Sequence, residues 1–258
     1  MELNLDNLTT DYDMSIIDDA GISISTISTC CSFEHSSINL KEFFKNIIID
    51  ENNIKNASYG DNTKPITKKK KRSFFNQITL EIFSPYKYKI NQETNIKKID
   101  KGVNIKIFKN GSIQMCGIKC IDDCKYILEY VIKYIKKNDL IINDNKELKI
   151  INFKLSLINC KIDVKYNIKR EKLYEILKDT EYPAIYSPCI HAAVKIKSFP
   201  DNDNPIPILI FQSGSIIILT KTIENVIKGH ELITNILSKY KDQIIRIDNK
   251  DLLDLLLK

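Results

Sequence analysis

The spacing of hydrophobic side chains changes between two periods along the chain. Residues 21–32 alternate isoleucine with serine or threonine, which is the two-residue period of a β-strand. The same strand character is found at 74–83 and Val103–Phe108. Residues 120–137 instead place apolar side chains three and four positions apart, which is typical of an amphipathic helix. The pattern therefore predicts an α+β protein.

The first half of the chain contains further elements between these segments. The sequence predicts a short helix over 40–49, a polar loop over 50–67 and an extended basic loop over 84–102. Asn110-Gly111 predicts a tight hairpin turn. A return strand over 113–116 is expected after this turn.

The second half repeats the same order of elements. We expect a strand first, then a short helix, three strands with a turn at Ser213-Gly214, a long amphipathic helix and a short helical tail. These elements are predicted at 149–160, 169–178, 191–198, 206–211, 215–219, 223–240 and 251–257.

An internal repeat is visible in the residues themselves. Residues 105–113 (IKIFKNGSI) and 208–216 (ILIFQSGSI) are identical at six of nine positions, and a long helix is predicted after each. Upstream, residues 38–41 are similar to 162–165. Isoleucine-rich hairpins resemble one another by chance, but the shared order of elements favours duplication of one unit. We divide the chain into an acidic flexible tail (1–20), repeat 1 (21–140, with insertions at 50–72 and 84–102), repeat 2 (148–242) and a C-terminal helical tail (243–258).

Composition narrows the function classes only moderately. Hydrophobic residues make up 43% and charged residues 28% of the 258 positions, which is usual for a globular protein. A net charge of +6 mildly favours a polyanionic partner. We identify no signal peptide and no apolar run approaching the roughly 18 residues of a membrane span, so an intracellular protein without a membrane partner is expected.

Cysteine and histidine spacing does not indicate a metal or catalytic site. The chain has seven cysteines, an odd number, and we expect them to be reduced. Cys116, Cys120 and Cys124 lie four residues apart, but a fourth ligand and a Cys-x-x-Cys pair are missing, so buried thiols are favoured. We predict no cofactor, no metal and no catalytic residues.

Three motifs resemble the TATA-box-binding protein family. Residues 211–218 (FQSGSIII) are similar to the family hairpin Ile-Phe-x-Ser-Gly-x-Ile, and 108–115 (FKNGSIQM) nearly so. Residues 188–194 (PCIHAAV) resemble Pro-x-x-Phe-Ala-Ala-Val, and 158–165 (INCKIDVK) resemble Leu-Gly-Cys-x-Leu-Asp-Leu-Lys. The resemblance covers roughly 22–242. It implies a pseudo-twofold saddle of two repeats, with a curved antiparallel sheet and helices on its convex face. The insertions indicate a divergent member, such as those of large DNA viruses or protists.

The resemblance also implies where DNA would bind. In this family the concave sheet face lies on the minor groove, and pairs of phenylalanines wedge between base steps. Phe75 and Phe108 match these positions in repeat 1, and His191 and Phe211 match them in repeat 2. Phe74 is an alternative to Phe75 by a one-residue shift, and Tyr182 is an alternative partner in repeat 2.

Other positions depart from the family pattern. Cys116 and Leu219 stand where the family has threonine at the centre of each half, and Asn152 lies one residue out of register with a base-contacting asparagine. Ser112 and Ser215 replace the hairpin lysines, which removes phosphate contacts. The basic run 68–72, with Lys70, Lys71 and Arg72, is either a phosphate-binding edge, a nuclear-import patch or a solvated loop.

The resemblance implies a non-enzymatic initiation factor that bends AT-rich double-stranded promoter DNA and recruits a TFIIB-like factor and an RNA polymerase. Such a protein would act in the nucleus or in a cytoplasmic viral factory. Two alternatives stay open. One is a protein-interaction module of the transcription machinery that has lost sequence-specific DNA binding. The other is an enzyme built on the same module, such as a glycosylase or nuclease.

Overall fold

A computed structural model describes residues 21–34, 36–50, 53–66, 74–83, 88–89, 97–98, 102–142, 148–182, 184–198 and 205–246. The chain forms two compact units, and the strands β1 and β9 contribute residues to both. Of the described residues, the first unit contains 26–156, and the second contains 21–25 and 157–246. The predicted tail 1–20, most of the insertion 84–102, the basic run 68–72 and the end of the C-terminal tail lie outside the described residues.

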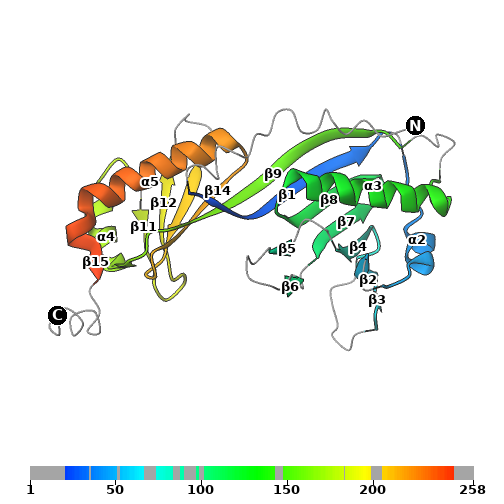
Figure 1. The fold of residues 1–258 in the computed structure, drawn as a ribbon, viewed down its shortest axis with the longest axis horizontal. Helices are drawn as coiled ribbons and strands as arrows, with labels where there is room; N and C mark the ends of the chain where they lie inside the picture. The colour runs from blue at the N-terminus through cyan, green and yellow to red at the C-terminus, as the bar shows by residue number, and fades with distance from the viewer. Residues whose placement is uncertain are drawn as a thin grey trace. The chain divides into compact units, whose positions relative to one another are not determined.

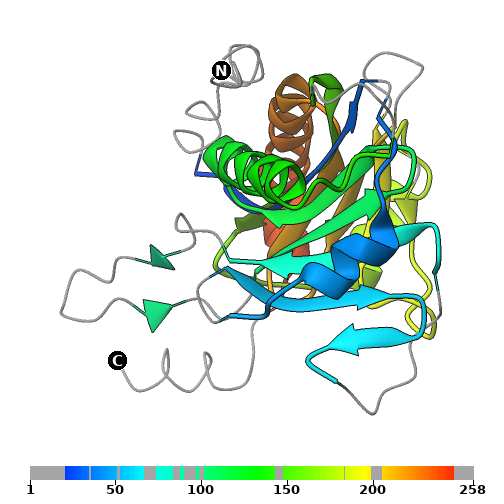
Figure 2. The ribbon, with the colours of Figure 1, turned by 90° about the vertical axis from the view of Figure 1, so that its right-hand side faces the viewer.

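The first unit is an antiparallel sheet with two helices. Its strand order is β9-β1-β8-β7-β4-β2-β3. Figure 2 shows α2 beside β2, and α3 packs on β8. The elements are β1 (Ser23–Phe33), α2 (Leu40–Asn46), β2 (Ile54–Tyr59), β3 (Asn62–Lys64), β4 (Gln77–Ile82), β5 (Tyr88–Lys89), β6 (Lys97–Lys98), β7 (Val103–Phe108), β8 (Ser112–Ile118) and α3 (Ile121–Lys137).

The second unit has the same plan. Its strand order is β11-β12-β13-β14-β9, and α5 lies along this sheet (Figure 1), packed on β13 and β14. The elements are β9 (Ile150–Asp163), β10 (Asn167–Ile168), α4 (Arg170–Leu177), β11 (Ala184–Ile185), β12 (Val194–Ser198), β13 (Ile206–Ile210), β14 (Ser215–Thr220), α5 (Ile223–Ile244) and β15 (Ile245–Arg246).

The core of each unit lies between one sheet face and its helices. Strands bury every second side chain, as in β7, where Val103, Ile105 and Ile107 are fully buried. The predicted apolar stripe of α3 is confirmed in full. Its buried members include Ile121, Cys124, Ile127, Leu128, Val131, Ile132 and Ile135. We call the opposite sheet face of each unit its open face.

Matching backbone contacts in the two units confirm the repeat. Phe33 N–H donates to the Gly111 carbonyl at 3.0 Å, and Val164 N–H donates to the Gly214 carbonyl at 3.1 Å. Directly before each short helix, a residue pairs with the segment after the long helix: Ile38 with Ile141, and Ile168 with Ile245. The structural counterpart of Ile38 is thus Ile168. The sequence-based match of 38–41 with 162–165 was wrong, because Ile162 still belongs to β9.

Most predicted elements are confirmed, with corrections at short strands. The segment 84–102, predicted as a loop, contains the paired strands β5 and β6, and the two-residue strands β10 and β15 were not predicted. The segment 50–67, predicted as a loop, forms β2 and the edge strand β3. In β2 only Ile54 and Ala57 are buried, so the hydrophobic alternation of a strand is missing. β11 has two residues and was not predicted. Short edge strands carry too few apolar positions to produce a periodic signal.

Candidate nucleic-acid interface

The open face of the second unit is an apolar strip between lysines. One row across the sheet pairs Lys195 with Leu209, Leu209 with Ile217, and Ile217 with Lys161. The apolar members are half-buried, since no helix covers this face. A second row adds Lys197 opposite Pro207 and Leu219 opposite Asn159. We call these eight residues the second open face.

The charges of this face are available to an anionic ligand. Lys161 is exposed, while Lys195 and Lys197 are half-buried. Among the described residues, neither Lys195 nor Lys197 forms an ion pair. Asp163, at the end of β9, is paired with Lys165 at 3.2 Å. The face therefore presents positive charge at both sides of an apolar centre.

Asn159 places a polar amide at this centre. It lies opposite Leu219, and its Oδ1 atom is buried without a hydrogen-bond partner among the described residues. Because amide oxygen and nitrogen exchange places by rotation of the side chain, the same site can present a donor. Sequence analysis missed Asn159, because only the register of β9 shows which face it occupies.

His191 and Phe211 meet at one end of this sheet. Their ring centroids are 6.1 Å apart, with 49° between the ring planes. Ala193 N–H donates to His191 Nδ1 at 3.1 Å, so the proton of a neutral ring lies on Nε2. The adjacent Ile190 is 86% exposed in a turn, which is held by its amide donating to the Ser187 carbonyl at 2.9 Å.

The candidate aromatic residues of the first unit are arranged differently. Phe108 lies on the open face opposite Gln77. Phe75 is 62% exposed, and its ring makes an edge-on contact with Tyr59 at 6.1 Å between centroids. The ring also lies against Gly60, where a β-carbon would collide with it. Phe74 is 49% exposed just before it. The structure thus pairs Phe75 with Tyr59.

The open face of the first unit is polar. Lys106 lies opposite Thr79 and Gln114, and no strip like that of the second unit is found on the described strands. Glu81 belongs to this face and accepts a hydrogen bond from the Gly102 amide at 3.0 Å and another from the Asn56 amide group. Its carboxylate is thus held in place on the sheet surface, where Lys55 Nζ lies 4.0 Å from its Oε1 atom and partly offsets its negative charge.

The remaining predicted site residues differ in position. Cys116 and Leu219 both lie on open faces, and Ser28 Oγ donates to Cys116 Sγ at 3.1 Å. Asn152 is exposed in β9, with a φ of 54° that interrupts the extended strand. Lys70, Lys71 and Arg72 lie outside the described residues.

Comparison with known proteins identifies the family. The fold matches that of Methanococcus jannaschii TBP, with a TM-score of 0.57 and 16% sequence identity over 84% of this chain and 98% of that chain. A protein of Acanthamoeba polyphaga mimivirus described as TATA-box-binding protein-like is 31% identical over 261 residues, covering 88% of this chain and 68% of the relative. The chain belongs to the TATA-box-binding-protein-like family. No family model matches it.

Membership of this TBP-like family confirms the resemblance that the motifs indicated, together with the predicted α+β fold of two repeats. No described helix has the length and apolar character needed to span a membrane. Within the described part of the chain, no cluster of three or more histidine, cysteine or acidic side chains could hold a metal ion.

Burial separates five of the seven thiols of this TBP-like chain into two classes, and Cys30 and Cys120 are half-buried. Burial raises the pKa of Cys31 and of Cys124 to about 12, and that of Cys160 to about 11. Cys116 and Cys189 are exposed. Cys116 lies on the first open face, and Cys189 lies beside Ile190. The reactivity of each thiol can therefore report a ligand bound at its own place.

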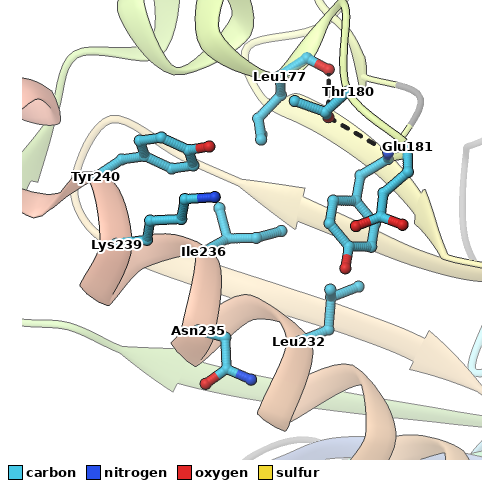
Figure 3. Close-up of a pocket in the computed structure, with 9 residues that line it drawn as sticks. Leu177, Thr180, Glu181, Leu232, Asn235, Ile236, Lys239 and Tyr240 are labelled. Carbon is cyan, nitrogen blue, oxygen red and sulfur yellow. Dashed lines mark hydrogen bonds between the residues drawn. The ribbon is translucent and has the colours of Figure 1, made fainter.

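A pocket of about 290 Å³ lies on the helix side of the second unit. Figure 3 shows Leu177, the last residue of α4, and Thr180 facing Leu232, Ile236 and Tyr240 of α5. Thr180 Oγ1 donates to the Leu177 carbonyl at 2.8 Å, which fixes this wall. Because α5 covers the opposite sheet face, this pocket is separate from the second open face.

Proposed function

We propose that this chain is a transcription initiation factor that binds and bends promoter DNA through the minor groove. The observation that carries the proposal is the second open face, with its flat apolar strip between lysines. Membership of the TBP-like family gives this surface its context. Binding, bending and recruitment are all part of the proposal.

The chemistry of the second open face suits a minor groove. Leu209, Ile217 and Leu219 can press against sugar edges, because they form an apolar strip on the sheet surface between the lysines. Lysines at both ends of the row can contact phosphates on the two sides of the groove. An A·T-rich groove presents acceptors only, so Asn159 would bind there through its amide N–H.

The second unit also supplies a wedge for kinking DNA. An inserted side chain must be apolar or aromatic, because it replaces base stacking. Phe211 supports His191 by ring contact, and the nearby Ile190 offers an apolar side chain at 86% exposure. In the first unit, the proposed wedge residues are Phe75 and Phe108.

A protein-interaction module that has lost specific DNA binding is the second candidate. Glu81, fixed on the first open face by two hydrogen bonds, favours this alternative. The polar first face would then bind a protein rather than a groove. The two candidates predict opposite results with naked DNA.

A fluorescence bending assay on end-labelled duplexes tests the proposal. The wild type should bind and bend an A·T-rich duplex and an inosine·cytosine duplex, which lacks the minor-groove amino group of G·C, better than a G·C duplex. Leu219→Glu and Phe211→Ala should reduce bending. Ile48→Ser, at an exposed isoleucine outside the second open face, is the control. Failure of the wild type to bind at low salt would exclude the proposal.

Recruitment is tested separately from DNA binding. The proposal expects a TFIIB-like factor and an RNA polymerase as protein partners, in a nucleus or a cytoplasmic viral factory. Affinity purification from the producing cells, with and without nuclease, distinguishes direct partners from those held through DNA. If Leu219→Glu loses DNA binding but still recovers these partners, the partners bind outside the second open face.

A further inference from the structure

Arg170, the first residue of α4, joins the two segments that carry His191 and Phe211. Its Nη1 atom donates to the Ala192 carbonyl, and its Nη2 atom donates to Gln212 Oε1 at 3.0 Å. Ala192 directly follows His191, and Gln212 directly follows Phe211. One guanidinium group thus bridges the backbone beside one candidate wedge residue and the side chain beside the other.

Other contacts hold this guanidinium in place. Arg170 lies over the ring of Tyr186, with 5.5 Å from its central carbon to the ring centroid. The Tyr186 hydroxyl donates to Glu171 Oε1 at 2.8 Å. Hydrogen bonds from its own backbone amide and then from this hydroxyl lower the pKa of Glu171, so the carboxylate stays charged beside Arg170. Ile168 N–H fixes the hairpin itself through the Gln212 carbonyl at 2.8 Å.

Among the described residues of the first unit, no such bridge is found at the equivalent place. The counterpart of Arg170 there is Leu40, which is the first residue of α2 and is buried. The carbonyl of Asn76, which corresponds to Ala192, accepts from the Lys109 amide at 3.1 Å. The same position of the repeat is therefore occupied by an apolar leucine in the first unit and by an arginine with two donor groups in the second.

We propose that Arg170 is a positioning residue that fixes the spacing of His191 and Phe211 and presets the wedge of the second unit. This inference rests on the proposed function, because the wedge acts on DNA. A planar guanidinium can hold two acceptors at once, which a lysine ammonium does less well. A preset wedge loses less side-chain freedom on binding than a mobile one. Arg170 acts through the protein and needs no phosphate contact.

The first test needs no DNA. The chain has three histidines, so the ring signals of His191 can be assigned by comparison with a His191→Gln variant. In the wild type, the His191 and Phe211 ring protons should show a nuclear Overhauser contact. We expect this contact to be lost in Arg170→Met and weakened in Arg170→Lys. Lys172→Met removes one positive charge from the same helix and should leave the contact intact. Retention in folded Arg170→Met would overturn the inference.

The second test uses an A·T-rich duplex. Arg170→Met should reduce the bend and lower affinity about two- to tenfold, the cost of ordering one or more side chains. The dependence of affinity on salt should not change. A phosphate-contact role would instead lower the salt slope by about one and keep the bend, which would also overturn the inference.

Two further controls keep these outcomes separable. If Arg170→Met fails to fold by circular dichroism, Gln212→Ala removes one acceptor of the bridge and should reproduce the loss of ring contact. Unchanged ring contact in Gln212→Ala and in Arg170→Lys would then exclude the positioning role. If the wild type neither binds nor bends DNA, the proposed function fails, while the ring contact still decides whether Arg170 positions the two residues.

Discussion

Leu219 on β14 lies directly opposite Asn159 on β9, and together they place a buried amide oxygen without a described partner beside a half-buried apolar side chain. An unpartnered buried polar atom costs stability unless a ligand or water completes it. On a sheet face without a covering helix, water or a bound ligand can complete the hydrogen bonding of this amide. This pair marks the centre of the second open face.

Asn159→Asp should weaken binding of A·T-rich DNA more than Asn159→Ala. The alanine variant removes one hydrogen bond, worth about 0.5–1.5 kcal/mol. The aspartate variant adds an acceptor-only negative group next to a groove that presents acceptors. Fluorescence anisotropy titrations measure both. Asn104→Asp places the same charge on the first open face and should have a smaller effect. Equal losses of DNA affinity in the two aspartate variants would contradict a DNA-binding surface centred on Asn159.

Thiol alkylation should report DNA on the wedge turn. Cys189 and Cys116 are exposed and should react first with iodoacetamide at pH 8, as peptide mass spectrometry would show. Cys31, Cys124 and Cys160 should react only after unfolding, because burial raises the pKa of each thiol. A saturating A·T-rich duplex should slow modification of Cys189, next to Ile190. A G·C duplex at the same concentration is the control, and an unchanged Cys189 rate in both would argue against a wedge at this turn.

The long elements could be predicted because each must bury one continuous apolar face. The stripe of α3 and the alternation in β7 need many apolar residues at fixed spacing, and this regularity is visible in the sequence. The repeat could be found for the same reason, since the glycine hairpins conserve their residues between units. The strands β2 and β3 could not, because they bury few side chains and so carry little apolar pattern.

The site was predictable only where a motif marks it. His191 and Phe211 were named from motifs, and the structure places their rings together. Asn159 and Arg170 were missed, because their roles depend on register and on contacts between distant segments. Leu40, the counterpart of Arg170, gives no hint of a cation at that position. Local sequence does not encode which acceptors a side chain reaches across the fold.

Stability should fall as the pH rises above about 9. An unfolded cysteine ionises near its ordinary pKa of 9.0, whereas Cys31 and Cys124 in the fold hold their protons until about 12. Because the thiol pKa is higher in the folded state, each thiol stabilises the fold fully below pH 9. This stability is lost as the pH rises toward 12, by up to about 1.4 kcal/mol per pH unit for each thiol. Urea midpoints at pH 8, 9 and 10 measure this. Cys124→Ala should flatten the decline, and Cys116→Ala, at an exposed thiol, should not. A pH-independent midpoint would contradict the buried thiol assignments.

Alanine variants of the two hairpin glycines and of Gly21 should distinguish the loss of stability caused by steric collision from that caused by backbone strain. Gly111 and Gly214 have φ values of 80° and 79°, and a β-carbon on either would collide with a backbone carbonyl, that of Ser36 or of Tyr166. Gly21, with φ of 69°, has open space around it. Gly21→Ala should therefore cost only the left-handed strain of about 1–2 kcal/mol. Gly111→Ala and Gly214→Ala should cost more, because the segment after the first strand of each unit must also move. Urea unfolding measures all three, and equal losses would mean that the hairpins do not pack closely against those carbonyls.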